Sequence, residues 1–384
     1  MTSIEAEQSK EQTFATQLAT RVVFFIAGLG MSAWAPLVPY AKERIDVSDA
    51  SLGGLLLFLG LGSLLAMPLT GMLVGKYGCK RVIISSGLGI MLVLPLLVIS
   101  PTPLLLAPGL MIFGASMGII DVAMNIQAVE VEKASRRAMM SGFHGFFSIG
   151  GIVGAGLISA LLWLGLPPLQ SVLMVSALIA LLFLACHKHL LNQRLHQSGT
   201  PLFVVPRGWV LFLGALCFIL FLTEGAVLDW SAIFLTHIQG LPASQAGLGY
   251  AIFSIAMTIG RLSGDRIVHR FGSVSVLLCG SLCAAAGLLL AVSVQHGMVS
   301  LAAFLLIGFG ASNSVPVLFS AAGKQEVMPV NLAISAMTTI GYAGILAGPA
   351  LVGFVSQWFS LSTAFVAIAT LLLVVAASAR LVTR

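Results

Sequence analysis

The stretch TEGAVLDW, residues 223–230, places Glu224 and Asp229 inside an apolar run that extends from about Trp209 to Leu235. A run of that length can cross a lipid bilayer, which takes about 20 apolar residues. A charged side chain at the middle of a bilayer costs about 2.5 to 3.5 kcal/mol on insertion scales, so an acid in such a run indicates function. We therefore interpret the rest of the chain as a frame that places this stretch beside a water-filled path.

The composition is that of an integral membrane protein. Of the 384 residues, 58% are hydrophobic and 8% are charged, whereas a soluble protein carries about 25% charged residues. The apolar runs are too long for barrel strands, and helices satisfy their own backbone groups within lipid. The net charge of +6 lies in short loops, so it reflects membrane topology and predicts no nucleic-acid partner.

Twelve apolar runs predict an all-α membrane protein with twelve transmembrane helices. Each run is about 18 to 25 residues long, which is the length that spans a bilayer. The expected spans cover residues 18–40, 51–74, 82–100, 103–127, 139–163, 168–187, 208–235, 244–264, 273–294, 298–322, 331–355 and 360–381.

The basic residues predict the orientation of these spans. Most of them fall on one side of the topology together with both termini, and the opposite loops hold only Lys42 and Arg44. The positive-inside rule then puts both termini in the cytoplasm. The longest polar connection, His187 to Arg207, separates six spans from six. We accordingly expect an N-terminal tail (1–17), a first six-helix bundle (18–187), a cytoplasmic linker (188–207) and a second six-helix bundle (208–384).

Short sequences repeat between the two halves at nearly one offset. The stretch Phe113-Gly114-Ala115-Ser116 recurs as Phe309-Gly310-Ala311-Ser312, 196 residues later (309 − 113), and the same offset separates Trp34 from Trp230. The stretch Gly75-Lys76-Tyr77-Gly78 matches His269-Arg270-Phe271-Gly272, 194 residues later (272 − 78). Such a duplication predicts two pseudo-symmetric bundles and is typical of secondary transporters, whose site lies near the midplane.

Several motifs carry a resemblance to a known family. They are Gly114-Ala115-Ser116, Val122-Ala123-Met124-Asn125, His144-Gly145-Phe146, Glu224-Gly225, Asp229-Trp230, Gly260-Arg261 with Gly264, and Gly341-Tyr342 with Gly348-Pro349. On these motifs the chain resembles the major facilitator superfamily over essentially its full length, and more narrowly the YbjJ-like branch of bacterial inner-membrane transporters. The resemblance implies a multi-pass protein of the bacterial inner membrane, built as a V-shaped pair of six-helix bundles.

The resemblance also implies a role for each span. Spans 1, 4, 7 and 10 would line a cavity, spans 2, 5, 8 and 11 would form the domain contact that rocks, and the others would support from outside. The intramembrane polar residues follow this division. The candidates for proton coupling or substrate binding are Asp121, Asn125, His144, Glu224, Asn313, Trp34 and Trp230. The candidates for gating are Asp229, Arg261, Asp265, Lys76, Arg270, Gly348 and Pro349.

Depth along the helices suggests one pair among these residues. Asp121 lies roughly 9 Å from the cytoplasmic end of its span and His144 roughly 8 Å from the start of its own, at 1.5 Å per residue. The two can therefore be level near an inner gate, either as a proton-coupling pair or as a structural hydrogen bond that never titrates. Asp121 and Asn125 are four residues apart and share one helix face.

Glu224 lies near the middle of span 7, where it is either an acid that gains and loses a proton as access alternates or a neutral, hydrogen-bonded side chain. Asp229 is five residues on, about 140° around a regular helix, so both face one point only if Gly225 distorts the turn. We expect Asp229 to cap or latch a neighbouring helix near the periplasmic surface. Trp34 and Trp230 are either interfacial belt residues or stacking platforms for a sugar or aromatic solute.

The gating candidates depart from the family pattern. Arg261 either snorkels to the interface or pairs with Asp265 or with a carboxylate across the domain contact. The loop Gly71 to Arg81 resembles the family's loop signature, but Gly75 occupies its acidic position and His269 does so in the second copy. Asp265 or Glu326 would have to substitute. The Gly-Pro element that drug exporters of the family carry on span 5 is absent there, and Gly348-Pro349 lies on span 11 instead.

The sequence holds no phosphate-binding Gly-Lys-Ser/Thr motif and no metal-ligand cluster, so we expect no enzyme, cofactor or metal site. The pattern favours a monomeric, proton-coupled secondary transporter that moves a small polar or amphipathic organic solute by alternating access within membrane lipid. Two alternatives stay open: a proton-driven exporter of drugs or metabolites, and a sensor or receptor that uses the same fold without transport.

Overall fold

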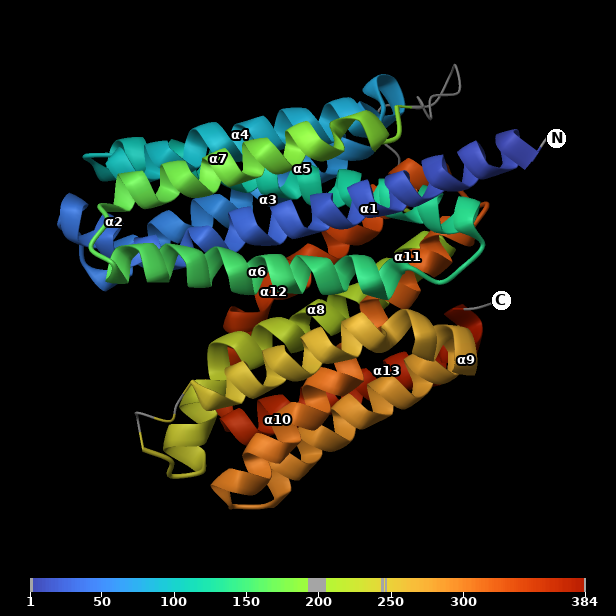
Figure 1. The fold of residues 1–384 in the computed structure, drawn as a ribbon. Helices are drawn as coiled ribbons and strands as arrows, with labels where there is room; N and C mark the ends of the chain where they lie inside the picture. The colour runs from blue at the N-terminus through green and yellow to red at the C-terminus, as the bar shows by residue number, and fades with distance from the viewer. Residues whose placement is uncertain (1–2, 193–204, 243–244, 246, 383–384) are drawn as a thin grey trace. The chain divides into compact units, whose positions relative to one another are not determined.

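The computed structural model describes residues 3–192, 205–242, 245 and 247–382, and these residues form helices joined by short turns (Figure 1). Within those ranges there is no β-strand. The α-helices are α1 Ser3–Ala33, α2 Val38–Ile45, α3 Asp49–Tyr77, α4 Cys79–Ile99, α5 Pro103–Ser135, α6 Met140–Trp163, α7 Pro168–Cys186, α8 Trp209–Ile233, α9 Leu248–Ser293, α10 Gly297–Ala311, α11 Ser314–Lys324, α12 Val330–Trp358 and α13 Leu361–Val382. Short 3-10 turns occupy Ala35–Leu37 and His187–His189, and a π turn occupies Phe234–Ile238.

Eleven helical segments in the described part of the chain are long and apolar enough to cross a membrane. The sequence predicts twelve because two expected spans, 244–264 and 273–294, follow each other without a loop and are counted together as α9. A single non-helical residue, Gly272, separates them, with φ 77° and ψ 155°. α1 begins at Ser3, so the stretch expected as an N-terminal tail is helical from that residue on.

The chain forms two compact units. Unit 1 comprises Met1–Arg136, Phe146–Val205 and Pro329–Ser335, and unit 2 comprises Arg137–Gly145, Pro206–Met328 and Ala336–Arg384. The first turns of α6 and α12 thus belong to the unit opposite to the one that the expected bundle boundaries give. Most of the expected linker, residues 193–204, lies outside the described residues.

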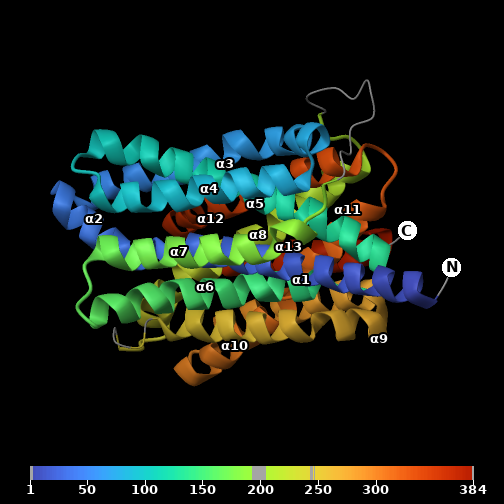
Figure 2. The same cartoon turned by 45° about the horizontal axis from the view of Figure 1, so that its top comes forward.

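Within each unit, glycines let helices approach closely. In unit 1, α4 and α7 lie side by side in both views (Figures 1 and 2), and α5 packs along α3. Gly114 of α5 lies against the backbone of Leu59 on α3, and Gly310 of α10 lies against the backbone of Gly280 and Ala284 on α9. A Cβ at either glycine would overlap those atoms, which is the small-residue packing expected of membrane helices.

The repeated loop has the same conformation in both halves. Gly78, between α3 and α4, has φ 84° and ψ 155°, nearly the angles of Gly272. Any residue other than glycine would be strained at such a positive φ. The ammonium of Lys76 lies 5.2 Å from the ring centroid of Tyr77, and the guanidinium of Arg270 lies 5.5 Å from that of Phe271. The internal repeat therefore extends from the sequence to the backbone and to one side-chain contact.

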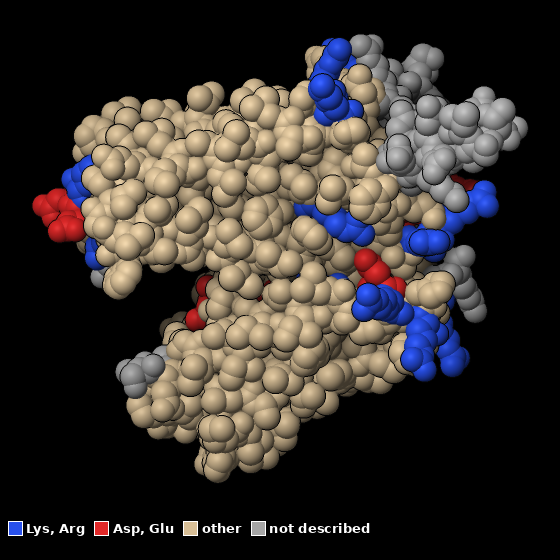
Figure 3. Space-filling view, viewed as in Figure 1, with Lys and Arg blue, Asp and Glu red and all other residues tan. Residues whose placement is uncertain are grey.

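On the face shown in Figure 3, most charged side chains lie toward the ends of the helices, and other residues cover most of their long sides. This distribution suits helices whose sides face lipid and whose ends reach water.

Candidate functional site

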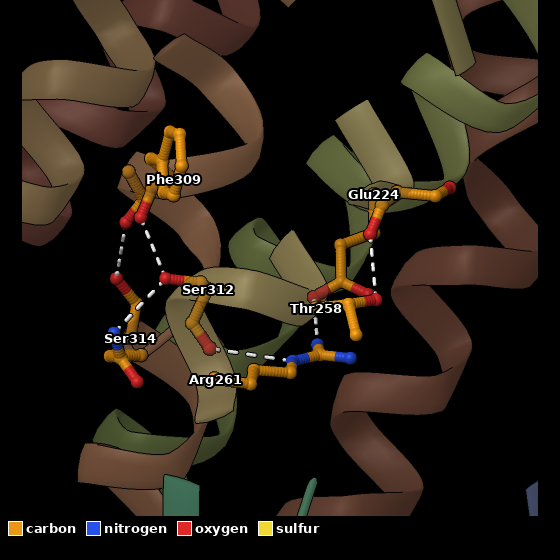
Figure 4. Close-up of polar contacts among 9 residues, drawn as sticks. Glu224, Thr258, Arg261, Phe309, Ser312 and Ser314 are labelled. Carbon is orange, nitrogen blue, oxygen red and sulfur yellow. Dashed lines mark hydrogen bonds and ion pairs between the residues drawn. The ribbon is translucent and has the colours of Figure 1, made fainter. Parts of the chain in front are cut away.

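An ion pair joins two membrane-spanning helices of unit 2. Nη2 of Arg261 on α9 lies 3.1 Å from Oε1 of Glu224 on α8, and the two side chains are 8% and 18% exposed. Nε of Arg261 also donates to the backbone carbonyl of Ser312, at 3.4 Å. Figure 4 shows Arg261 between these two acceptors. The carboxylate of Glu224 thus neutralises the buried guanidinium, and the backbone carbonyl of Ser312 accepts a hydrogen bond from it.

The carbonyl of Ser312 is free for Arg261 because the helix breaks there. α10 ends at Ala311 and α11 begins at Ser314. In a continuous helix the Ser312 carbonyl would accept from the residue four positions later, which is Pro316, and proline has no N–H to donate. The hydroxyl of Ser312 turns back to the carbonyl of Phe309, at 2.7 Å. The break therefore exposes a backbone acceptor inside a predicted span.

Asn313 fastens this break to α9. Its Nδ2 donates to the carbonyl of Gly260 at 3.1 Å and to the hydroxyl of Ser312 at 3.0 Å. Its Oδ1 is buried and has no hydrogen-bond partner among the described residues. Gly264 lies so close that a Cβ there would overlap this oxygen. Glu224, Arg261 and Asn313, which the sequence places on three spans, are thus connected in one polar network.

Asp265 contacts the start of α6, which also belongs to unit 2. Its two carboxylate oxygens accept from the backbone N–H of Gly142, at 3.0 and 3.1 Å. Gly142 is in the first turn of α6, where backbone donors have no partner within the helix and the dipole favours an anion. The sequence offered Asp265, or a carboxylate across the domain contact, as the partner of Arg261. The structure pairs Arg261 with Glu224 of the same unit, and the carboxylate of Asp265 binds the α6 terminus.

His144, two residues further along α6, is 8% exposed. Its ring centroid lies 5.6 Å from that of Phe319 on α11. Asp121 lies on α5 in unit 1, where Asn125 donates to its backbone carbonyl at 2.9 Å and contacts its Oδ1 at 3.5 Å. Asp121 and Asn125 thus do meet on one helix face. The pairing of Asp121 with His144 stays a prediction, since the two residues belong to different units.

The two matched tryptophans share an unusual feature. Trp34 is 4% exposed and Trp230 is half-buried, and the indole Nε1 of each is buried without a hydrogen-bond partner in the described part of the chain. The ring of Trp230 lies near Gly353 of α12. A buried donor left unpaired costs about 1 to 3 kcal/mol, so two such donors at equivalent positions call for a reason.

The other gating candidates are spread over the two units. Asp229 is exposed on α8, and Lys76 and Arg270 are exposed beside the rings described above. Gly348 is buried against Leu222 of α8, and Pro349 lies inside α12. None of these residues is a partner of the Glu224–Arg261 pair in the contacts given above.

Sequence reasoning missed two residues at the start of α12. In unit 1, Nδ2 of Asn331 donates to the carbonyl of Gly71 and Oγ of Ser335 donates to that of Met67, each at 2.6 Å. A Cβ at Gly75 would lie 3.0 Å from Nδ2 of Asn331. The available signal was that Asn331 and Ser335, four residues apart, form a polar face on an apolar helix.

The sequence profile of the family described as Major Facilitator Superfamily matches residues 22–325. The chain belongs to the major facilitator superfamily. An uncharacterised MFS-type transporter of Yersinia pestis is 61% identical over 378 residues, which are 98% of each chain. Membrane protein MosC of Rhizobium meliloti is 31% identical over 368 residues, 94% of this chain and 88% of MosC.

Solved structures show the same fold. The fucose:proton symporter FucP of E. coli matches with a TM-score of 0.77 at 19% identity, over 96% of this chain and 98% of that one. The human organic anion transporter MFSD10 matches with a TM-score of 0.74 at 17% identity, over 96% and 99% of the two chains. The predicted superfamily and the predicted all-α fold of two pseudo-symmetric bundles are confirmed. The chain is a multi-pass membrane transporter and not an enzyme.

Proposed function

We propose that this transporter couples the movement of a small polar or amphipathic organic solute to protons, by alternating access across the bacterial inner membrane. The observation that carries the proposal is the ion pair between Glu224 and Arg261, which lies within two membrane-spanning helices. A buried ion pair is costly in such a setting, so its retention indicates a use.

The pair has the chemistry of a proton-linked switch. Arginine keeps its charge at every physiological pH, so only Glu224 can change charge within the pair. While the two side chains are in contact, Arg261 stabilises the carboxylate form of Glu224 and opposes its protonation. Separation of the pair removes that stabilisation and lets Glu224 take up a proton. A conformational change that separates the two side chains would therefore be linked to proton uptake, and their reunion to proton release.

The proposed substrate class follows from the two tryptophans whose indole N–H groups have no partner in the described part of the chain. The indole N–H groups of Trp34 and Trp230 can donate to hydroxyl or carbonyl oxygens while their rings stack on an apolar face. Asp121, Asn125 and Asn313 would add further polar contacts on the spans that the family uses for its cavity, and His144 would add one from the adjacent domain-contact span. The description of FucP names fucose and a proton for that protein, and we propose the same kind of coupling here, with a solute of comparable size. We further propose that the protein is a monomer with both termini in the cytoplasm.

The test is uptake by the purified full chain in proteoliposomes with an imposed pH gradient. A ligand-stabilisation screen first supplies a solute that raises the melting temperature. We expect this solute to accumulate only under the gradient, and Glu224→Gln to abolish accumulation while solute exchange at equal concentrations persists. Glu43→Gln, at an exposed acid on α2, is the control and should accumulate solute normally.

Accumulation by Glu224→Gln at the rate of the unaltered protein would refute the coupling role. Outward movement of the solute under the same gradient would instead favour the exporter. Ligand stabilisation without any flux would favour the sensor.

A further inference from the structure

Unit 2 contains a cavity of about 720 Å³. It is lined by the start of α8 at Trp209, by Ser273 just after the break in α9, by Ser320 and Lys324 of α11, and by Leu381 near the end of α13. A volume of that size is typical of small-molecule sites. Glu224, Arg261 and Asn313 are not among the lining residues, so the cavity is separate from the proposed transport site.

The cavity lies where membrane-spanning helices end. Trp209 is the first residue of its span, and Lys324 is the last residue of another. Val382, which also lines the cavity, ends a third span. Helix ends of this kind reach the zone of lipid headgroups, and tryptophan is enriched there. The cavity therefore lies at the depth of the membrane surface.

The lining of the cavity combines groups that can donate hydrogen bonds to a phosphate with apolar side chains. Lys324 supplies an exposed ammonium, and Ser273 and Ser320 supply hydroxyls that can donate to phosphate oxygens. Trp209 and Leu381 supply apolar surface beside them. Glu326 is the one acid among the lining residues. A ligand with an anionic, oxygen-rich head and an apolar attachment would satisfy both parts.

The charge around the cavity depends on the ends of the lining helices and on the basic residues near them. The N-terminus of α8 attracts anions, whereas the C-termini of α11 and α13 repel them. Each of these C-termini carries a basic residue in its last turn, Lys324 and Arg380 respectively. Arg207 precedes Trp209 by two residues, and Arg270 precedes Ser273 by three. Each of the four chain segments that line the cavity thus has a basic residue within three positions of a lining residue, and Glu326 is the single acid in the lining.

We propose that this cavity binds the phosphate of an anionic amphiphile at the membrane surface. The phosphate can come from the headgroup of an anionic phospholipid or from a free phosphorylated solute, since both present the same oxygens. Basic pockets between transmembrane helices near the membrane surface are known to hold acidic headgroups. The proposal does not depend on proton coupling.

The test measures binding to the purified full chain with two probes. Native mass spectrometry counts retained phosphatidylglycerol, with phosphatidylcholine as the neutral comparison, and calorimetry measures binding of glycerol 3-phosphate. One basic residue near a membrane surface is worth a factor of about five in affinity, so Lys324→Gln should weaken binding of the effective probe about fivefold. Lys188→Gln is the matched control, because Lys188 is exposed in unit 1 and does not line the cavity.

Ser320→Asp is a second variant, which places a carboxylate in the lining and should weaken binding further. Its melting temperature without probe shows that it is folded. Loss in both variants with phosphatidylglycerol assigns the site to a lipid headgroup, and loss with glycerol 3-phosphate assigns it to a free phosphate. Binding of neither probe, or binding that Lys324→Gln and Ser320→Asp leave equal to the control, would overturn the proposal.

Discussion

Asn331 donates its side-chain amide to the backbone carbonyl of Gly71 over 2.6 Å, and this contact holds the first turn of α12 on α3 within unit 1. Ser335, one turn later, makes the equivalent contact to Met67. Both donors are uncharged. Gly75, at the position where the family signature carries an acid, leaves room beside the amide of Asn331. At the start of α6 the corresponding role belongs to a carboxylate, that of Asp265.

The uncharged contact can be tested by removing its donors. Asn331→Ala should lower the free energy of unfolding by about 1 kcal/mol, the usual worth of one hydrogen bond, and Ser335→Ala should add a similar loss. Thermal unfolding in detergent measures both. Thr370→Ala, which removes an exposed hydroxyl bonded only within its own helix, should change little. A loss as large in this control would remove any special role of Asn331.

The carboxylate at α6 should respond to a change of charge alone. Asp265→Asn keeps an oxygen that can accept from Gly142 but removes the negative charge beside the helix N-terminus. We expect a loss of about 0.5 to 1 kcal/mol in stability, the worth of a charge at a helix end. Asp46→Asn, at an exposed residue that already adopts a left-handed conformation, is the matched control, and equal losses in the two variants would contradict the capping role.

The ion pair predicts a double-mutant cycle with strong coupling. Arg261→Gln leaves Glu224 as a buried carboxylate without its cation and should cost about 3 to 5 kcal/mol. The double variant Arg261→Gln with Glu224→Gln removes both charges, so it should recover part of that loss. Melting temperatures of the three variants and the unaltered protein complete the cycle. Additive losses would mean that the two side chains do not interact.

The close approach of Gly264 to Asn313 predicts a steric penalty. A methyl group at Gly264 would overlap Oδ1 of Asn313 and Cβ of Ser141, so Gly264→Ala should destabilise by about 1 to 3 kcal/mol through overpacking. Gly156→Ala on α6 is the control, since no atom lies within 4 Å of the added methyl. In a helix this control should be neutral or more stable by up to about 1 kcal/mol. The reverse order of the two variants would contradict the close packing at Gly264.

The unpaired indole N–H groups of Trp34 and Trp230 allow an effect on solute binding to be distinguished from an effect on stability. Trp34→Phe and Trp230→Phe each remove a buried, unpaired donor, so neither should lower the melting temperature appreciably. If the indoles donate to the solute, both variants should weaken its binding about fivefold or more, in line with one lost hydrogen bond. Trp163→Phe, at an indole that is 85% exposed, should bind normally. Unchanged binding in Trp34→Phe and Trp230→Phe would leave packing as their role.

Hydropathy predicts the spans because lipid forces each crossing segment to be a continuous apolar helix. It does not predict that two of them join at Gly272, since a single positive φ has no signature in hydrophobicity. Glu224 stands out in the sequence as an acid in an apolar run. Its partner Arg261 is 37 residues away on another helix, so only the packing of α8 on α9 reveals the pair.

Other parts of the site carried signals that hydropathy does not use. Pro316 removes the donor that the carbonyl of Ser312 would otherwise have, and a proline inside a predicted span is a sign of a broken helix. Asn331 and Ser335 show a polar face of two residues, which is too short to stand out from serines and threonines that bond within their own helix.

At Gly78 and again at Gly272, a single non-helical residue connects two helices. One extra residue at either position would rotate the following helix by about 100° and turn its buried side outward. Ordinary surface loops absorb insertions, but these two would not, and an inserted tag or an added residue there should abolish folding. In each half, the single connecting glycine thus fixes which face of the following helix is buried.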